Sequence, residues 1–374
     1  MWAGNGMGGI YESNLQSYIK YLYRQRKHIS AGRIIIAKLE GAVMEKINNT
    51  QSGRGYLFRV SASEVCNYDC AFCHPSTNER VEVLRDQDLV RIFKEMNDLF
   101  VLKTLHFTGG EPLTRKNLPE IVAQCRSIGG ENLDIAMTTN AALLGARLDE
   151  IIAAGLNRAN ISLHALHDDK YRSFVGRDVE VKNVLRTIDT ALKKGLSIKV
   201  NSVVIRNFND MDVVEMAKYC FDRNIIPRFL ELGIYGPVAQ WFSEKDQVAH
   251  NEIFEKIDEV FGPFERDYTH RGNGPSKYYR NSQGYVFGIL DNQSDTLCRG
   301  CDRFRMSANG YIKVCNFEPI DLRKHLENSD DLRKQLLLLG NVLDSRGNDY
   351  IGKRLHRNDY NFRWNHPEKN RNEG

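Results

Sequence analysis

Short runs rich in β-branched and aromatic residues alternate with helical patterns from Tyr56 onward. Six such runs predict strands, at residues 56–62, 104–108, 133–139, 157–163, 197–205 and 226–232. Between them, apolar residues recur at helical spacing over residues 87–100, 117–128, 144–154, 182–194 and 211–224. This order predicts repeated strand–helix–strand units, and therefore a parallel sheet with helices outside it.

The fold class that this pattern favours is α/β, a partial (β/α)6 TIM-type barrel with a C-terminal extension. A Rossmann sheet is disfavoured because no Gly-x-Gly-x-x-Gly motif follows the first predicted strand. In a barrel, the chemistry lies on the loops at the C-terminal ends of the strands. We therefore look for reactive residues directly after each predicted strand.

The alternation of strands and helices divides the chain into four predicted parts. Residues 1–54 form an N-terminal extension, which contains an amphipathic helical pattern over residues 17–48. Residues 55–235 form the barrel, and residues 236–344 form a polar C-terminal domain that carries a second group of cysteines. Residues 345–374, rich in Arg, Asn and His, form a polar tail.

Composition narrows the class of protein further. With 374 residues, 41% of them hydrophobic, the chain can bury a large core without disulfides. The net charge of +4, without a long basic block, does not indicate a nucleic-acid partner but suits a locally basic pocket for an anionic substrate. No apolar run is long enough to span a membrane and no secretory signal is evident. Eight cysteines in such a chain predict a location in the reducing cytoplasm. They also predict that some of the thiols are metal ligands.

The strongest local motif is Cys66-Asn-Tyr-Asp-Cys70-Ala-Phe-Cys73, directly after the first predicted strand. Three thiolates at this spacing can hold three irons of a cubane cluster and leave the fourth iron open for a small molecule. The alternative is a zinc site completed by a residue such as His74.

A second motif, Thr108-Gly109-Gly110-Glu111-Pro112, follows the second predicted strand. Glycines there let the backbone approach a ligand closely and expose its polar groups. Together, the two motifs resemble those of the radical S-adenosylmethionine (SAM) superfamily. The resemblance implies a [4Fe–4S] cluster on Cys66, Cys70 and Cys73 whose open iron is chelated by SAM. It also implies that the glycine motif binds the amino group of SAM.

Another cysteine triad, Cys298, Cys301 and Cys315, lies in the C-terminal segment. By itself it would fit a zinc ribbon-like site or a cluster that only stabilises the fold. Combined with the first triad, it resembles the pattern of the GTP 3′,8-cyclases of molybdenum-cofactor biosynthesis. That resemblance implies a second [4Fe–4S] cluster, which binds the purine base of the substrate through an open iron.

The resemblance covers roughly residues 55–340 and can be carried over residue by residue. The positions that it assigns to SAM are Phe72, Gly109, Gly110, Glu111, Pro112, Ser162 and Gly233. The positions that it assigns to GTP are Arg59, His106, Thr138, Lys199, Arg303 and Arg305. The chemistry agrees, because arginine stays charged and binds phosphate through two parallel hydrogen bonds. The implied reaction uses a 5′-deoxyadenosyl radical to convert GTP to 3′,8-cyclo-GTP.

Three features depart from the family pattern. The second predicted strand has Thr104 and His106 where the family carries basic residues, the chain ends Asn372-Glu373-Gly374 rather than in Gly-Gly, and the N-terminal extension is longer. They keep open an alternative, a paralogue that modifies a different nucleotide or a natural-product precursor. A non-catalytic zinc or nucleic-acid-binding module is the third hypothesis, from a different class.

The expected partners are a nucleotide substrate, GTP first, and an electron donor. Two further partners are expected, a downstream pterin-forming enzyme and a second copy of the chain in a homodimer. Neither a nucleic acid nor a membrane is expected as a partner. The remaining cysteines, Cys125 and Cys220, fall within helical patterns and are predicted to be core residues.

Overall fold

The computed structural model describes residues 55–73, 82–234, 236–269, 276–290, 301–314 and 319–345. All of them belong to one unit, Ile47–Gly374. The predicted helix at 17–48, the tail beyond 345, and the residues His74, Cys298 and Cys315 lie outside the described residues.

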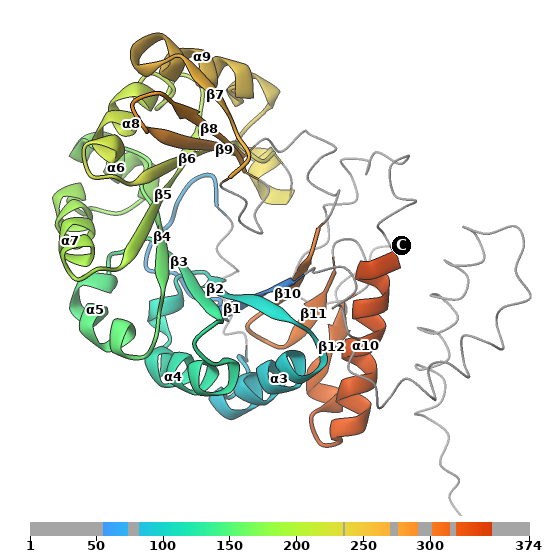
Figure 1. The fold of residues 1–374 in the computed structure, drawn as a ribbon. Coiled ribbons are helices and arrows are strands. Elements are labelled where there is room, and N and C mark those ends of the chain that lie inside the picture. Colours follow the sequence, from blue (N-terminus) through green and yellow to red (C-terminus); the bar gives the residue numbers. More distant parts are fainter. Residues whose placement is uncertain are drawn as a thin grey trace, which may run out of the picture. The chain divides into compact units, whose positions relative to one another are not determined.

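Six strands in sequence order form the centre of a curved sheet with helices along its outer side (Figure 1). Each pairs in parallel with the next. They are β1 (Tyr56–Ser63), β2 (Leu102–Gly109), β3 (Asp134–Thr139), β4 (Arg158–Ser162), β5 (Ser197–Val204) and β6 (Ile226–Glu231). The predicted strands agree with these bounds to within two residues, and the partial barrel is confirmed.

Helices connect successive strands, as the helical patterns predict. The predicted ones are α3 (Asp86–Leu99), α4 (Leu118–Gly129), α5 (Leu144–Ala153), α7 (Val181–Lys193) and α8 (Val213–Phe221). Cys125 on α4 and Cys220 on α8 are fully buried, which confirms them as core residues. The sequence analysis missed α6 (Asp168–Val175), because this short helix begins with two acids and has too few apolar residues to show a period.

The sheet continues beyond the six predicted strands at both edges and has twelve strands in all among the described residues. On the β6 edge lie β9 (Val286–Leu290), β8 (Lys277–Asn281) and β7 (Phe264–Asp267). On the β1 edge lie β10 (Arg303–Met306), β11 (Tyr311–Lys313) and β12 (Ile320–Asp321). The segment after residue 235 therefore extends the barrel sheet from both sides (Figure 1).

The other described helices lie in the second half of the chain, apart from one short 3₁₀ turn after β2. They are α9 (His250–Phe261) and α10 (Ser329–Ser345), with 3₁₀ turns η3 (Pro112–Thr114), η4 (Gly236–Gln240), η5 (Glu244–Asp246) and η7 (Leu322–His325). Within the described part of the chain, no helix combines the length and the apolar character that crossing a bilayer requires.

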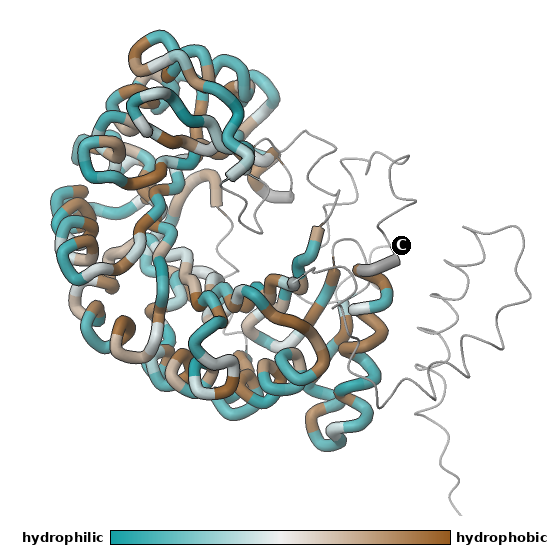
Figure 2. Tube along the Cα trace, in the orientation of Figure 1, coloured by the Kyte–Doolittle hydropathy of each residue, from teal (hydrophilic) through white to brown (hydrophobic). Residues whose placement is uncertain are grey.

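Alternation along the strands gives the sheet two different faces. On β5, Ile198 and Val200 are buried, whereas Lys199 and Asn201 on the opposite side are half-buried. The apolar side meets the helices, and the helices carry hydrophilic residues as well as hydrophobic ones (Figure 2). The inner face of the sheet is therefore polar, which is unusual for a packed core and typical of a binding surface.

An aromatic cluster joins the C-terminal strands to the barrel. Phe304 on β10 is fully buried, with its ring centroid 5.4 Å from that of Tyr56 on β1 and 4.9 Å from that of Phe100. Parallel pairing of Leu57 with Arg303 and of Arg59 with Arg305 places β10 beside β1. Packing of Phe304 thus holds the strand that carries Arg303 and Arg305.

We expect Phe304→Ala to lower the free energy of unfolding by about 3–5 kcal/mol, because a large buried ring is replaced by a cavity. A urea titration followed by circular dichroism measures it. Trp241→Ala is the matched control, since this ring is 78% exposed and its loss should change stability by less than about 0.5 kcal/mol. Equal effects of the two substitutions would contradict the packing described for β10.

Candidate active site

The first cysteine triad lies on the loop that follows β1. Cys66 and Cys70 are half-buried and Cys73 is exposed. The loop is anchored to α6, since the Asp69 backbone N–H donates to the Val175 carbonyl at 2.8 Å. Burial, together with the neighbouring Cys73 and Cys66, raises the pKa of the Cys70 thiol to about 12. Three thiols that oppose each other's ionisation suit a cationic cluster, which binds thiolates.

The donor set of the triad is compatible with a cubane cluster. Among the described residues, no three His, Cys, Asp or Glu side chains converge on one metal ion. In a cubane cluster each cysteine binds a different iron, so its ligands do not converge on one point. The donor set of Cys66, Cys70 and Cys73 on one short loop fits such a cluster.

Gly109 and Gly110 end β2 against the loop that carries the triad. A Cβ on Gly109 would lie 2.1 Å from the Ser63 carbonyl oxygen, and one on Gly110 would lie 2.3 Å from that of Val65. The backbone N–H of Gly110 donates to Ser63, and that of Glu111 donates to Val65, both at 2.8 Å. The two glycines thus pack closely against the chain's own cysteine loop, and their predicted approach to a ligand stays a prediction.

The carboxylate of Glu111 connects three elements at this end of the sheet. It is buried, and it accepts hydrogen bonds from the Leu113 N–H at 3.1 Å, the Thr139 hydroxyl at 2.8 Å and the Asn140 N–H at 2.8 Å. Burial raises the pKa of Glu111, and these three donors oppose that rise. Pro112, also buried, begins η3 beside it.

Asn140 extends this network to the cysteine loop. Its Nδ2 donates to Asn67 Oδ1 at 2.7 Å and lies 3.9 Å from Cys66 Sγ. The Tyr68 N–H also points to Cys66 Sγ, at 3.4 Å. Burial raises the pKa of the Cys66 thiol, and the donors on Tyr68 and Asn140 oppose that rise because they stabilise the thiolate form.

Aromatic packing fixes the position of Phe72, near the end of the cysteine loop. The ring of Phe72 lies 4.8 Å from that of His164 and 5.0 Å from that of Phe174, in edge-to-face contacts. His164 is buried, its Nδ1 accepts the Val203 N–H at 3.1 Å, and burial lowers its pKa to about 3. His164 is therefore a neutral structural residue.

The remaining predicted SAM positions lie at the same ends of the strands. Ser162 ends β4 and pairs with Asn201 on β5. Gly233 follows β6 and is half-buried. The seven predicted SAM positions therefore all follow or end a strand of the barrel, or lie on the cysteine loop itself.

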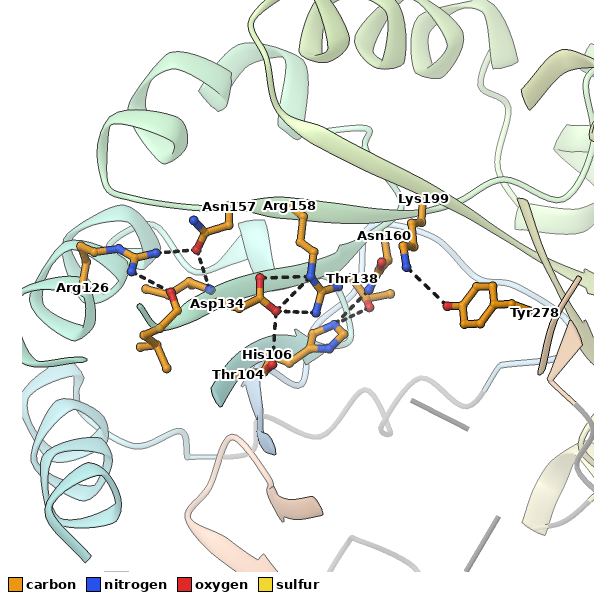
Figure 3. A network of polar contacts seen from close by, with 12 residues as sticks. Thr104, His106, Arg126, Asp134, Thr138, Asn157, Arg158, Asn160, Lys199 and Tyr278 are labelled. Carbon is orange, nitrogen blue, oxygen red and sulfur yellow. Dashed lines mark hydrogen bonds and ion pairs between the residues drawn. The ribbon is translucent and has the colours of Figure 1, made fainter. Parts of the chain in front are cut away.

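The predicted substrate positions share the inner face of the sheet. Register places Arg305, Arg59 and His106 side by side on β10, β1 and β2. His106 Nε2 lies 2.8 Å from the Thr138 hydroxyl, and Lys199 Nζ donates to the Tyr278 hydroxyl at 3.4 Å (Figure 3). The substrate positions lie nearer the middle of the strands than the SAM positions do.

Arg303 connects this face to the second triad. Its Nε donates to Cys301 Sγ at 3.4 Å, and Cys301 directly precedes β10 in the chain. Cys298 and Cys315 lie outside the described residues, so Cys301 alone represents the second triad here.

Three strands each present a buried polar atom that has no hydrogen-bond partner within the described ranges. The atoms are Asn160 Oδ1 on β4, Asn201 Oδ1 on β5 and Arg228 Nε on β6. Leaving a buried polar group unsatisfied costs about 1–3 kcal/mol. Neighbouring strands that each carry one indicate a surface built to receive another molecule.

Two family models match this chain. Residues 60–220 match the Radical SAM superfamily, and residues 225–349 match Molybdenum Cofactor Synthesis C. The GTP 3′,8-cyclase of Staphylococcus haemolyticus is 32% identical over 305 residues, which are 78% of this chain and 89% of that protein. The chain belongs to the GTP 3′,8-cyclase family.

Another relative and one solved structure agree with this membership. The GTP 3′,8-cyclase of Listeria welshimeri is 35% identical over 69% of this chain and 78% of its own length. The structure of Streptococcus suis SuiB bound to S-adenosylmethionine has a TM-score of 0.55 at 15% identity. It covers 91% of this chain and 78% of the SuiB chain, and it supports the fold alone.

Family membership makes this protein a radical SAM enzyme with two [4Fe–4S] clusters and SAM as cofactors. The zinc alternatives for the two triads and the non-catalytic module are thereby set aside. The residues present fit these groups. The three thiols and the two glycines lie at one end of the sheet, and the buried polar atoms without partners lie on the inner face of the same sheet.

Several site residues were missed by the sequence analysis. They are Asn67, Asp134, Arg158, Asn160, Asn201 and Arg228. All but Asn67 occupy inner-face positions of β3 to β6, and on β4 a polar residue stands at every second position. That alternation is visible in the sequence and could have identified them.

We expect Gly110→Ala to displace the cysteine loop, since its Cβ would lie within 3.0 Å of the Val65 carbonyl and the Cys66 nitrogen. Overpacking of this kind costs about 1–3 kcal/mol. Iron content and SAM cleavage should both fall. Gly195→Ala is the control: its φ of +80° makes the change strained, but nothing lies within 4 Å, so both readouts should persist. Full iron in the Gly110 variant would contradict this close packing.

We expect His164 to make the protein less stable as the pH falls. Its pKa is about 3 when folded and near 6.5 when unfolded, so below pH 6.5 only the unfolded chain gains a proton. Between pH 7.5 and pH 6.0 this should lower the free energy of unfolding by about 0.8 kcal/mol, measured by anaerobic urea titration.

The variant His164→Gln provides the comparison for that measurement. It should be less stable at both pH values, because the stacking on Phe174 is lost. The difference between the two pH values should shrink by the same 0.8 kcal/mol or so. An undiminished difference would show that His164 takes up its proton in the folded state as well.

Proposed function

We propose that this protein converts GTP to 3′,8-cyclo-GTP, the first step toward molybdopterin. The observation that carries the proposal is the placement of Arg59 and Arg305 in one register row on the inner face, with Arg303 beside Cys301. Guanidinium groups in such a row suit the phosphates of a nucleotide, because each can donate two parallel hydrogen bonds to a phosphate. The family relatives named GTP 3′,8-cyclase support GTP as that nucleotide.

The cysteine triads hold the two clusters. Cys66, Cys70 and Cys73 bind the cluster at the end of β1, and Cys298, Cys301 and Cys315 bind the other. When bound there, the first cluster would supply the one-electron reduction that cleavage of SAM requires. Glu111, through Asn140 and Asn67, keeps the first loop in place during that chemistry.

SAM binds at the C-terminal ends of β2, β4 and β6 and on the cysteine loop. The proposed contacts are Phe72, Gly109, Gly110, Glu111, Pro112, Ser162 and Gly233. Glu111 Oε1 and Oε2 already accept protein donors, so its part is to shape the η3 turn that ends the glycine motif. The phenyl ring of Phe72, packed edge-on against His164, supplies a rigid wall.

The nucleotide binds across the inner face. The proposed contacts are Arg59, His106, Thr138, Lys199, Arg303 and Arg305. The arginines orient the phosphates, and fixing both reactants on one sheet replaces a bimolecular encounter by a positioned one. The unsatisfied atoms of Asn160, Asn201 and Arg228 lie on the same face and gain partners when the ligands are bound.

We further propose a cytoplasmic location, an external electron donor, a downstream pterin-forming enzyme that takes the product, and a homodimer. Reduced cysteines as cluster ligands support the location. A one-electron cleavage of SAM requires the donor.

Deuterium transfer tests the proposed reaction. With GTP deuterated at the 3′ carbon, we expect deuterium in 5′-deoxyadenosine and a cyclic nucleotide of unchanged elemental composition apart from that exchange. Mass spectrometry of both products measures it. Cys70→Ala should abolish both products, because a ligand of the first cluster is lost.

The matched control is Cys125→Ala, which removes a buried helical thiol far from either triad in the sequence. It should retain deuterium transfer with at most a modest loss of stability. Cleavage of SAM by the unchanged protein without any deuterium transfer would reject GTP as substrate and favour a different nucleotide or a natural-product precursor.

A further inference from the structure

His106 occupies the third place in a row that otherwise consists of arginines. Arg59 pairs with Arg305 on one side and with His106 on the other, on parallel strands whose spacing is about 4.8 Å. Residues opposite each other on parallel strands point to the same face. A phosphate chain held by Arg305 and Arg59 therefore reaches His106 next.

The contacts of His106 support a neutral imidazole. The residue is buried, and its Nε2 has two neutral neighbours, Thr138 Oγ1 at 2.8 Å and Asn160 Nδ2 at 3.4 Å (Figure 3). Burial lowers the pKa of His106 well below its usual range, and the charges of Arg59, Arg158 and Arg228 lower it further. Protonation would add an unpaired cation to an already cationic surface.

The neighbouring strands β3 and β4 do not supply the missing charge. Arg158 is held by Asp134 through contacts of 2.8, 3.0 and 3.1 Å. Thr104 donates to the same carboxylate at 3.2 Å, which closes the triad Thr104–Asp134–Arg158 (Figure 3). The charge of Arg158 is thus balanced inside the protein, and β2 contributes the neutral Thr104, His106 and Thr108 to this face. The further cations of the face, Lys199 on β5 and Arg228 on β6, lie three and four strands along the sheet from β2.

One buried acceptor indicates what this neutral part of the face binds. Asn160 Oδ1 has no hydrogen-bond partner among the described residues, although the other end of its amide contacts His106. A hydroxyl or water can donate to this oxygen, whereas a phosphate oxygen would repel it. The group made by His106, Thr138 and Asn160 is therefore neutral and gives a phosphate beside it no charge-assisted contact.

We infer that His106 determines phosphate-chain specificity, so that the site discriminates little between a purine nucleoside triphosphate and the corresponding diphosphate. This rests on the proposed function, because it assumes that the phosphates lie along the Arg305–Arg59 row. The neutral imidazole offers the terminal phosphate no charge-assisted contact, and the cations on β1 and β10 bind the two phosphates that both nucleotides share.

The experiment measures dissociation constants of GTP, GDP and ATP for the SAM-loaded holoenzyme by anaerobic equilibrium dialysis. The variants are His106→Gln, which stays neutral, and His106→Arg, which adds a cation. We expect the GTP-to-GDP affinity ratio to be within about threefold of unity for the unchanged protein and for the Gln variant. In the Arg variant it should rise roughly tenfold, as one added charge-assisted contact predicts.

Two outcomes would overturn the inference. A Gln variant that loses affinity for GTP tenfold more than for GDP would show that His106 is charged and contacts the terminal phosphate. An Arg variant that folds, as judged by full iron content, and keeps the unchanged ratio would show that His106 does not lie beside that phosphate. The Gln variant tests the inference even if the Arg variant does not fold.

Failure of the proposed function looks different in the same data. A preference for ATP would reject GTP as the substrate, while the ratio between ATP and ADP would still test His106. Binding of none of these nucleotides would overturn both the proposed function and the inference.

Discussion

The candidate site depends most on the hydrogen bonds that the buried carboxylate of Glu111 accepts. It joins the end of β2, the turn η3 and the start of the loop after β3. Through Asn140 and Asn67 the same network reaches Cys66. A charged group in such a place is costly unless it is hydrogen-bonded, and here three backbone or hydroxyl donors contact it. The position of the cysteine loop is therefore determined by these contacts with the sheet rather than by the loop's own short sequence.

A second constraint is the register of the parallel strands. Because each strand alternates sides, one inner-facing position determines all the others on that strand. Arg59, His106 and Arg305 share a row only because β1 pairs in parallel with both of its neighbours. The polar inner face, with its unsatisfied Asn160, Asn201 and Arg228 atoms, is a consequence of the same alternation. Stability comes from the outer, apolar side, which leaves the inner side available for chemistry.

The six barrel strands and five helices were predictable because each has a local apolar period, visible in a short window. The strands β7 to β12 were not, since most are two to five residues long and their pairing depends on partners far away in the chain. The triad of Cys66, Cys70 and Cys73 was found by its spacing alone. The pairing of Asp134 with Arg158 and the neutral state of His106 depend on contacts between strands, and a sequence does not display those contacts.

The parallel pairing of β10 with β1 also affects how the chain is made. Leu57 pairs with Arg303, so most of the polypeptide is synthesised after β1 and before the strand that covers its edge. During that interval the edge of β1 and the side of Tyr56 that packs on Phe304 remain uncovered on the nascent barrel. An uncovered strand edge invites pairing with other chains. Completing this sheet is therefore a late event in biosynthesis. A chain that stops short of β10 exposes an aggregation-prone strand edge beside its cysteine loop.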